Sequence, residues 1–314
     1  MTKHLFIEKI KNYYGDENTE YHWMSSGFQN IVIKCTHHSK TIFVRIAESN
    51  RRTYEMIQAE IDWLFTLSKA TLHVPTALPS HQSKMIEEIV IGQDLYYVVA
   101  FHEVEGEFMD VTNQEIWNTH LFEEWGAVLG RIHKTTPNKP LARPEQWETS
   151  SSVIETINYF TLEENEAMNN RLQEIVNEIS TLPINSSTFG LIHNDFHQGN
   201  MLIHHQGIGV IDFDDCMFGW YAQDFAVALY HADWQATEIA RLDSSFSSTF
   251  LDSFIKGYER SYTLSPDTLK QISLFLRWRE FFLYALFMQK WSLHDLQDWQ
   301  SFTLEKLRHR ILQG

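Results

Sequence analysis

The stretch LIHNDFHQGN at residues 191–200, with GVIDFDD at residues 209–215 after it, decides how this chain is interpreted. Each half begins as a short apolar run with strand character and ends in polar residues. Asp195 could accept a proton from an attacking hydroxyl, Asn200 offers a neutral oxygen, and Asp212 offers a hard anionic oxygen. Oxygen ligands of this kind suit Mg²⁺, which binds through a few protein oxygens plus nucleotide phosphates. The pattern therefore predicts metal-phosphate chemistry on two loops that follow two strands.

The spacing of these residues resembles a known family pattern. His193-x-Asp195-x-x-x-x-Asn200 matches the catalytic loop of the protein-kinase-like superfamily. Asp212-Phe-Asp stands where protein kinases carry Asp-Phe-Gly, and Asp224-Phe-Ala follows. Together these segments look like the branch of aminoglycoside phosphotransferases and choline kinases, which includes homoserine kinases and RdoA-type stress-response kinases. The resemblance implies a bilobal protein-kinase-like fold and transfer of the γ-phosphoryl group of ATP to an acceptor.

The resemblance also implies a role for each residue of the pattern. Asp195 is expected to be the catalytic base, and His193 is expected to brace the catalytic loop. Asp224 is expected to hold that loop through its backbone amides. The expected ligands of Mg²⁺ are Asn200, Asp212 and Asp214. A different interpretation treats His193, Asp195 and His197 as a zinc site, but it leaves Asn200 and the IDFDD run without a role.

The nucleotide side of the pattern lies in the first hundred residues. Ser26 and Gly27 precede a hairpin strand and could cover phosphates through backbone N–H groups, although an ordinary loop explains them equally well. Arg45 stands in the middle of a strand, where kinases usually place a Lys that holds nucleotide phosphates. Glu60 lies beside the apolar stripe of the next helix, where an unpaired carboxylate is costly. We therefore expect an ion pair between Arg45 and Glu60, with exposure of Glu60 at the edge of the stripe as the alternative.

The segment FHEVEG at residues 101–106 is the expected hinge between the two lobes. The resemblance implies that backbone groups of His102 and Val104 bind the adenine edge. A plain exit from a strand into a loop is the other explanation of this segment.

The distribution of apolar residues predicts an α+β chain with two lobes. Residues 30–35 and 41–47 predict a hairpin, residues 52–69 a helix, and residues 84–91 and 95–101 two more strands. Helices dominate the rest of the chain, with two short strands at residues 189–192 and 208–211 and a helix that starts at Ser265-Pro266. The predicted domains are a small β-rich nucleotide-binding lobe at residues 1–101 and a larger, mostly helical catalytic lobe at residues 102–314.

Composition excludes several classes of partner. The 314 residues include 25 Lys and Arg against 41 Asp and Glu, which gives a net charge of −16. An acidic chain without a basic run is a poor partner for nucleic acid and for anionic membranes. The chain has two cysteines and no apolar run of about 18 residues, so neither a disulfide framework nor a membrane span is expected. We expect a cytoplasmic monomer or homodimer.

The acceptor is expected to be a small molecule. Only eleven residues separate Asp212 from Asp224, whereas protein kinases use a much longer segment there to dock a peptide. An aminoglycoside, a choline-like amine, an amino alcohol or an amino acid would each suit such a site. Arg277 and Arg279 lie in an apolar helix, where one of them could meet an anionic substrate group or form an internal salt bridge. A protein Ser/Thr kinase of the RdoA type and a catalytically silent nucleotide-binding scaffold remain as alternatives.

Overall fold

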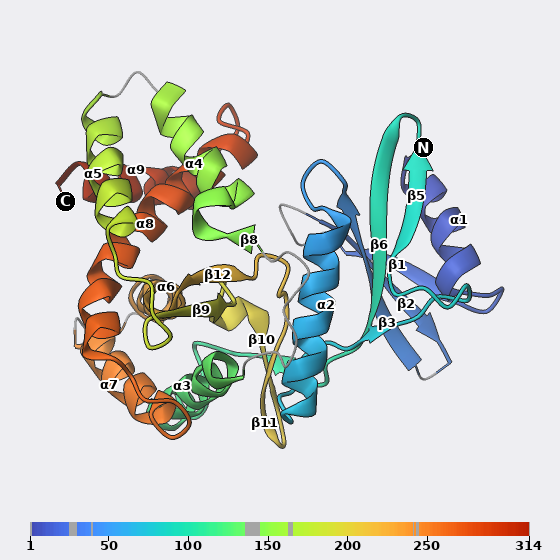
Figure 1. Ribbon diagram of the computed structural model, residues 1–314, viewed down its shortest axis with the longest axis horizontal. Helices are drawn as coiled ribbons and strands as arrows, with labels where there is room; N and C mark the ends of the chain where they lie inside the picture. Colours follow the sequence, from blue (N-terminus) through green and yellow to red (C-terminus); the bar gives the residue numbers. More distant parts are fainter. Residues whose placement is uncertain are drawn as a thin grey trace. The chain divides into compact units, whose positions relative to one another are not determined.

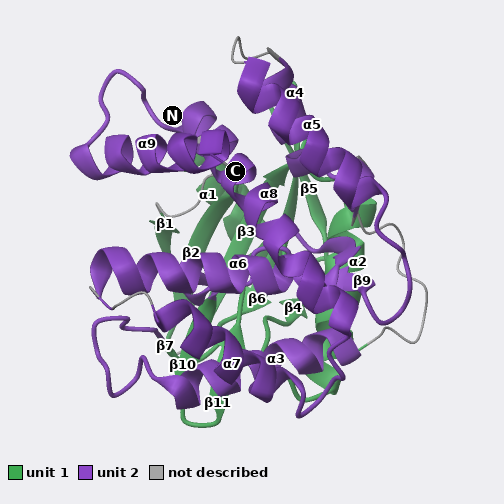
Figure 2. Ribbon diagram, turned by 90° about the vertical axis from the view of Figure 1, so that its left-hand side faces the viewer, with its two compact units in different colours: residues 1–107, 135–144, 201–214 green, residues 108–134, 145–200, 215–314 purple. Residues whose placement is uncertain are grey.

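The computed structural model describes residues 2–24, 30–38, 40–135, 145–162, 166–240, 242 and 245–313. Contacts divide the chain into two compact units, which Figure 2 colours separately. Unit 1 comprises residues 1–107, 135–144 and 201–214, and unit 2 comprises residues 108–134, 145–200 and 215–314. This division rests on contacts alone, and the functional boundary after residue 101 stays a prediction.

Unit 1 is built on an antiparallel sheet (Figure 1). The strand order is β1-β2-β3-β6-β4, and β5 also pairs with β6. The predicted hairpin is confirmed, since Ile33 of β2 lies opposite Val44 of β3 in an antiparallel register. The strands are β1 (Glu20–Met24), β2 (Ile31–His37), β3 (Lys40–Glu48), β4 (Ala77–Leu78), β5 (Glu87–Ile91) and β6 (Asp94–His102).

Two helices accompany this sheet, of which the sequence predicted one. The predicted helix is α2 (Tyr54–Lys69), whose N-cap Thr53 accepts a hydrogen bond from the backbone N–H of Met56. The expectation of a single helix in the first hundred residues was wrong, because α1 (Thr2–Tyr14) precedes the sheet. Its buried residues recur every four positions and join the core formed by the strands. They are Phe6, Ile10 and Tyr14.

A hairpin far along the chain also belongs to unit 1. It consists of β10 (Met201–His204) and β11 (Gly207–Val210), paired antiparallel, and β7 (Glu107–Phe108) continues its sheet. The predicted strand near 208–211 corresponds to β11, whereas β10 was not predicted. The hairpin leads directly into the IDFDD segment, so the end of β11 fixes where the segment with Asp212 and Asp214 begins.

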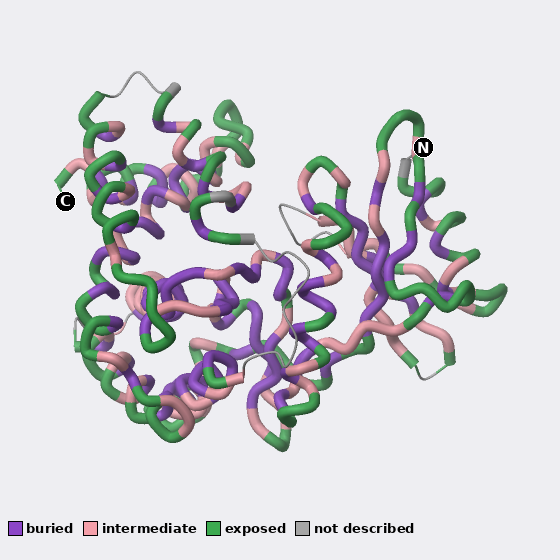
Figure 3. Tube along the Cα trace, in the orientation of Figure 1, coloured by how far each residue is buried: buried purple, intermediate pink, exposed green. Residues whose placement is uncertain are grey.

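Unit 2 is mostly helical and is organised around α6 and α8. Residues 221–228 at the start of α6 are all buried, and α6 packs against α8. Buried stretches of chain, purple in Figure 3, run through the interior of each unit. The predicted start of α8 is confirmed, because the Ser265 side chain accepts from the backbone N–H of Asp267 and Pro266 is the first helical residue. The helices are α3 (Thr119–Lys134), α4 (Ser151–Leu162), α5 (Glu166–Ser180), α6 (Tyr221–Trp234), α7 (Phe246–Tyr258), α8 (Pro266–Lys290) and α9 (Asp298–Gln313).

Short elements complete unit 2. The strand at 189–192 is confirmed as β9 (Phe189–Ile192), and it pairs antiparallel with β12 (Met217–Trp220). β8 (Glu145–Gln146) pairs parallel with β12. Three further turns are the 3-10 turns η1 (Trp147–Thr149) and η2 (Gln198–Asn200) and the π-helical η3 (Gln235–Ile239). Across the described part of the chain, every helix is too short or too polar to span a bilayer.

Glycines allow α3 and α7 to pack backbone to backbone. A Cβ placed on Gly126 would lie 1.9 Å from the carbonyl oxygen of Phe254, and one on Gly257 would lie 1.8 Å from that of Glu123. No side chain fits at such distances, so the two helices depend on glycine at these positions. This close contact holds the end of α3 beside Tyr258, which contributes to the site described below.

Candidate active site

The catalytic-loop segment runs from the end of β9 to η2 and is anchored by Asp224. This residue lies in the first turn of α6 and is fully buried. Its Oδ2 accepts a hydrogen bond from the backbone N–H of His193 at 2.9 Å, and its Oδ1 accepts from that of Asn194 at 2.7 Å. The predicted role of Asp224 is therefore confirmed. A carboxylate that accepts backbone N–H groups makes strong, charge-assisted hydrogen bonds, so this contact fixes the start of the loop.

A second set of contacts shapes the loop at the two residues before Asp195. Asn194 has a left-handed φ of 70°, and its side-chain oxygen accepts from the amide of Gln223. His193 is fully buried, and its Nδ1 accepts from the backbone N–H of Asp195 at 3.3 Å. The ring of His193 therefore braces the backbone at the residue that carries the proposed chemistry.

Asp224 is itself held by a histidine from α3. His133 Nε2 lies 3.1 Å from Asp224 Oδ2, and His133 Nδ1 lies 2.9 Å from the hydroxyl of Tyr258. Burial lowers the pKa of His133, and the Asp224 carboxylate opposes that shift. The neutral ring then donates from Nε2 to Asp224 and accepts at Nδ1 from Tyr258. This contact of His133 with Asp224 was not predicted from the sequence.

The side chain of Asp195 is contacted on both of its oxygens. Arg279 Nη2 donates to Oδ1 at 2.6 Å, and His197 Nε2 lies 3.2 Å from Oδ2. Asn200 Nδ2 donates to Oδ2 at 3.1 Å and to the backbone carbonyl of Asp195 at 2.9 Å. The side chain of Asp195 keeps 28% of its surface exposed, so the carboxylate is both positioned and accessible.

These neighbours keep Asp195 ionised. Burial by itself raises the pKa of this carboxyl, but His197 and Arg279 outweigh it and hold the pKa well below its ordinary range. The carboxylate is thus charged at any pH near neutrality. A carboxylate with a low pKa is a weak base, so it accepts a hydrogen bond from a hydroxyl and takes its proton only as the reaction proceeds.

Two residues near Asp195 were not assigned to the site from the sequence. His231 of α6 stacks on His197 with ring centroids 4.5 Å apart, and its Nε2 lies 2.8 Å from Arg279 Nη2. Arg279 comes from α8, and its need for a partner was the one signal that the sequence offered. Arg277 instead pairs with Glu178 at 2.9 Å on the exposed face. Of the two arginines, one forms an internal pair with Asp195 and the other a surface pair.

The zinc interpretation of the loop is wrong. Nδ1 of His193 and Nδ1 of His197 each accept from a loop N–H, that of Asp195 and that of Gly199 respectively. Within the described ranges, no group of three or more His, Cys, Asp or Glu side chains is arranged to hold a metal ion. The alternating residues of this segment therefore serve the loop and do not converge on one ion.

In unit 1, the predicted ion pair between Arg45 and Glu60 is confirmed. Arg45 Nη1 donates to Glu60 Oε1 at 2.8 Å, and Nη2 donates to Oε2. Glu60 is 3% exposed, so the alternative of an exposed stripe edge is wrong. The guanidinium makes a forked contact that a Lys could not make, which explains how Arg serves at this strand position.

The same part of unit 1 holds Asp214. Its carboxylate contacts Arg51 and lies 3.5 Å from Arg45 Nη1 and 3.5 Å from Arg52 Nε, and Asn30 Nδ2 donates to it at 2.9 Å. Burial raises the pKa of Asp214, but Arg45, Arg52 and Arg51 outweigh burial and lower the pKa strongly. The role of Asp214 as a metal ligand stays a prediction, and it has to coexist with these arginines.

Phe213 anchors the segment that carries Asp212 and Asp214. It is 1% exposed and packs edge-to-face against Trp63 of α2, with ring centroids 5.4 Å apart. Asp212 itself has a left-handed φ of 62°, which is uncommon for a residue with a side chain. Strained backbone of this kind concentrates at functional sites, where the surrounding contacts maintain it.

Each unit, taken by itself, offers an oxygen donor of the kind that a hard divalent cation takes. Asn200 turns its amide nitrogen toward Asp195, so the oxygen of the same amide is directed away from that carboxylate. In unit 1, Asp212 carries a carboxylate two residues after the end of β11. An amide oxygen and a carboxylate are the ligands that Mg²⁺ prefers, together with phosphate oxygens.

The expected nucleotide contacts are described in part. Ser26 and Gly27 lie outside the described residues. The backbone N–H of His102 donates to the carbonyl of Thr76 at 3.0 Å, so an adenine contact at this position would use the His102 carbonyl. The backbone of Val104 follows two residues later, and its contact with adenine stays a prediction.

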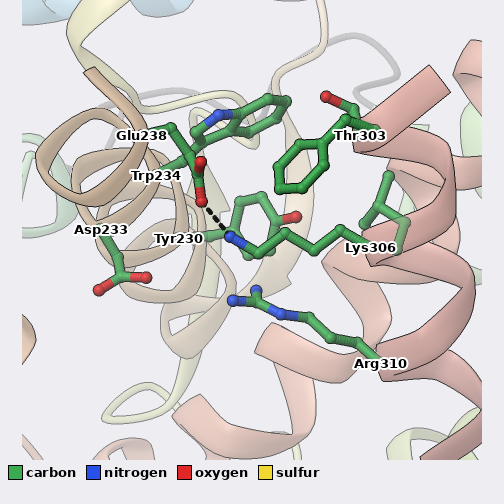
Figure 4. A pocket seen from close by; sticks show the side chains of 9 residues that line it. Tyr230, Asp233, Trp234, Glu238, Thr303, Lys306 and Arg310 are labelled. Carbon is green, nitrogen blue, oxygen red and sulfur yellow. Dashed lines mark hydrogen bonds and ion pairs between the residues drawn. The ribbon is translucent and has the colours of Figure 1, made fainter. Parts of the chain in front are cut away.

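A small pocket in unit 2 is separate from the catalytic loop. It lies between α6, η3 and α9, and the ion pair between Glu238 and Lys306 crosses it (Figure 4). Neither Asp195 nor Arg279 lines it. Its lining consists of Tyr230, Asp233, Trp234, Glu238, Phe302, Thr303, Lys306, Leu307 and Arg310.

The chain is similar in sequence and in structure to known kinases. The sequence pattern of the phosphotransferase enzyme family matches residues 24–270. The chain is 26% identical over 291 residues to the amicoumacin kinase of Bacillus subtilis (strain 168), which covers 91% of this chain and 85% of that protein. The solved structure of amicoumacin kinase hAmiN in complex with AMP-PNP, Ca²⁺ and Ami superposes with a TM-score of 0.87 at 24% identity, covering 100% of this chain and 94% of that one. A microcompartment-associated aminopropanol kinase superposes with a TM-score of 0.76 at 18% identity, covering 98% and 95%. The α+β, kinase-like fold is confirmed.

Proposed function

Because the chain belongs to the phosphotransferase enzyme family and is an ATP-dependent kinase of a small-molecule hydroxyl, we propose that Asp195 is the base that receives the acceptor hydroxyl. The observation that carries this assignment is the carboxylate of Asp195, which is ionised, partly exposed and fixed by contacts to both oxygens. Phosphoryl transfer demands positioning more than covalent chemistry, so an oriented weak base is sufficient. The hydroxyl donates to Asp195, and its proton moves to the carboxylate as the new bond from the hydroxyl oxygen to the γ-phosphorus forms, while the bond from the γ-phosphorus to the bridging oxygen breaks and ADP leaves.

The proposed metal ligands are Asn200, Asp212 and Asp214, and the proposed metal is Mg²⁺. Bound Mg²⁺ supplies neutralisation of phosphate charge during transfer. Asn200 contributes its amide oxygen while its nitrogen restrains Asp195, so one side chain couples metal binding to the position of the base. Asp212 contributes its carboxylate, and the arginines around Asp214 add positive charge to the same segment.

The proposed ATP contacts come from the first lobe and from the hinge at residues 101–106. Arg45, fixed by Glu60, carries the cation that faces nucleotide phosphates, and Ser26 and Gly27 supply backbone N–H groups. His102 and Val104 bind the adenine edge through backbone groups. The small number of residues between Asp212 and Asp224 supports a small acceptor in preference to a peptide.

The proposed acceptor is a hydroxyl compound that also carries an amine. The named relatives act on amicoumacin and on aminopropanol. A net charge of −16 favours a cationic acceptor over an anionic one through the long-range field of the chain. A cytoplasmic location and a monomeric or homodimeric state accompany this proposal.

The test is a screen for acceptor-dependent release of ADP, combined with Asp195→Asn. Amicoumacin, 1-amino-2-propanol, choline and representative aminoglycosides are supplied with ATP and Mg²⁺. We expect one class to stimulate ADP release, and we expect Asp195→Asn to reduce that turnover by about 10²–10⁴-fold while ATP still binds. Asp267→Asn, on an exposed residue of α8, is the matched control. Turnover in Asp195→Asn equal to that of the wild type would remove Asp195 from the mechanism.

The metal assignment has its own test. Asp212→Asn should weaken ATP binding in the presence of Mg²⁺ and leave binding in the presence of EDTA unchanged, because only the metal-dependent part is lost. Isothermal titration calorimetry measures both affinities. Equal loss under the two conditions would mean that Asp212 acts on the nucleotide without the metal.

A further inference from the structure

The guanidinium of Arg279 contacts the carboxylate that the proposed mechanism assigns to the base. It projects from α8 and donates from Nη2 to Oδ1 of Asp195 at 2.6 Å, while His197 and Asn200 contact Oδ2. The terminal torsion of an aspartate is soft, so a carboxylate held at one oxygen still rotates. Contacts at both oxygens fix the plane of the carboxylate.

Arg279 is itself fixed by its surroundings. Its Nε and Nη2 both donate to His231 Nε2, at 3.3 and 2.8 Å, and its guanidinium lies over the ring of Phe282 at 4.9 Å from the centroid. The side chain is 8% exposed. His231 stacks on His197, so the imidazole that holds the arginine also packs against the imidazole on the other side of Asp195.

The hydrogen bonds define the state of His231. Nε2 receives both donors, so this nitrogen carries no proton and the ring is neutral. Burial, with His197 and Arg279 nearby, lowers the pKa of His231 well below its ordinary value, which agrees with the geometry. His231 therefore acts as a permanent acceptor for Arg279 near neutral pH.

Stability alone does not account for an arginine at this position. α8 is buried along much of its length, with apolar neighbours such as Phe275, Trp278 and Leu283. A buried ion pair is often no more stable than a well-packed apolar side chain of similar size. The guanidinium of Arg279 instead provides a directed hydrogen-bond donor to Asp195, the carboxylate on which the reaction depends.

We propose that Arg279, held by His231, is a positioning residue for phosphoryl transfer that fixes the orientation of the Asp195 carboxylate. This inference rests on the proposed role of Asp195. Arg279 acts through Asp195, so its loss should reduce the rate of transfer more than the affinity for ATP. Lys at this position retains the charge but loses the fork, so it should restore part of the rate.

The test compares Arg279→Met, Arg279→Lys and Arg277→Met. The control residue Arg277 lies two positions away on the same helix, and its side chain is 41% exposed and pairs with Glu178. ADP release is measured with the acceptor selected in the screen. Arg279→Met should lower kcat by about 10²-fold, with the KM for ATP within about twofold of the wild type. The kcat of Arg279→Lys should be about tenfold higher than that of Arg279→Met, and the kcat of Arg277→Met should match the wild type.

A second pair of variants separates positioning from folding. His231→Phe keeps an aromatic ring against His197 but cannot accept from Arg279, whereas His231→Gln retains an acceptor oxygen. We expect kcat to fall by about tenfold in the Phe variant and to stay closer to the wild type in the Gln variant, at similar melting temperatures.

Three results would overturn the inference. These are a wild-type kcat in Arg279→Met, a wild-type kcat in His231→Phe, and equal losses in Arg279→Met and Arg279→Lys when both melt like the wild type. If Asp195→Asn is inactive while Arg279→Met is fully active, this inference alone fails. If Asp195→Asn is active, the proposed function of Asp195 fails first.

Discussion

The carboxylates of Asp195 and Asp214 share one feature and differ in another. Neighbouring side chains, His197 and Arg279 at Asp195 and arginines alone at Asp214, hold the pKa of each below its ordinary range against the opposing effect of burial. Asp195 has one arginine and keeps 28% of its side chain exposed, whereas Asp214 has three arginines and keeps 4%. A carboxylate with one cation and an open side can still bind a hydroxyl. A carboxylate that three guanidinium groups contact also organises the segment that carries it.

The first prediction tests that contrast with the largest expected effect on stability. Asp214→Asn removes the charge that balances Arg45, Arg51 and Arg52. Breaking a buried ion pair by removing one partner typically costs about 3–5 kcal/mol, so we expect a loss of that order in the free energy of unfolding. Urea denaturation followed by circular dichroism measures it.

The control for this prediction is Asp267→Asn, since Asp267 is 58% exposed and pairs with Lys270 one turn away. It should change the free energy of unfolding by less than about 1 kcal/mol. Equal effects of the two substitutions would show that the arginines around Asp214 do not depend on its charge.

The second prediction concerns Asp224, which links the catalytic loop to α6 and to His133. In Asp224→Asn, one of the two backbone N–H groups of His193 and Asn194 faces an amide NH₂ in place of an oxygen. Losing hydrogen bonds to a charged group costs about 1.5–3 kcal/mol, and displacement of the loop should lower kcat by about 10²-fold. Chemical denaturation and the ADP-release assay measure the two effects. Asp252→Asn, on an exposed residue of α7, should change neither.

Contacts within the signature motifs were predictable from the sequence, and contacts between distant helices were not. The loop from His193 to Asn200 has a spacing that fixes which groups meet, and Arg45 and Glu60 are only 15 positions apart. In each case the two partners lie in the same element or in elements that follow one another in the sequence. The apolar period of α2 placed Glu60 on the sheet side, which required a cation there.

The partners of Asp195 from α6 and α8 needed three-dimensional packing. Arg279 is 84 positions from Asp195 and 48 from His231. α8 has apolar residues all round, so its periodicity does not show which face meets the loop. That face is determined by how α8 packs on α6. The arginines around Asp214 were missed for the same reason, because Arg51 and Arg52 look like ordinary polar residues before a helix.

The third prediction concerns His133, which contacts Asp224, and the dependence of stability on pH. Burial lowers the pKa of His133 in the folded state, so the unfolded chain takes up a proton below about pH 6.5 that the folded chain does not. Stability therefore falls as the pH drops through this range. His133→Gln should reduce the slope of stability against pH between about pH 5 and 6.5 by up to about 1.4 kcal/mol per pH unit. Urea denaturation at several pH values gives the slope, and the exposed His120→Gln should leave it unchanged.

The last and smallest expected effect separates charge from geometry at Arg45. Arg45→Lys keeps a cation beside Glu60 and Asp214 but replaces the forked contact with a single one. We expect a loss of about 1 kcal/mol in the free energy of unfolding and a rise of less than tenfold in the KM for ATP, because one hydrogen bond is lost and the charge remains. Arg45→Met should have a larger effect on both quantities, since it leaves Glu60 buried without its cation. If the Lys and Met variants were equally impaired, the fork itself would be the essential feature, and unit 1 would depend on guanidinium geometry as closely as Asp195 depends on Arg279.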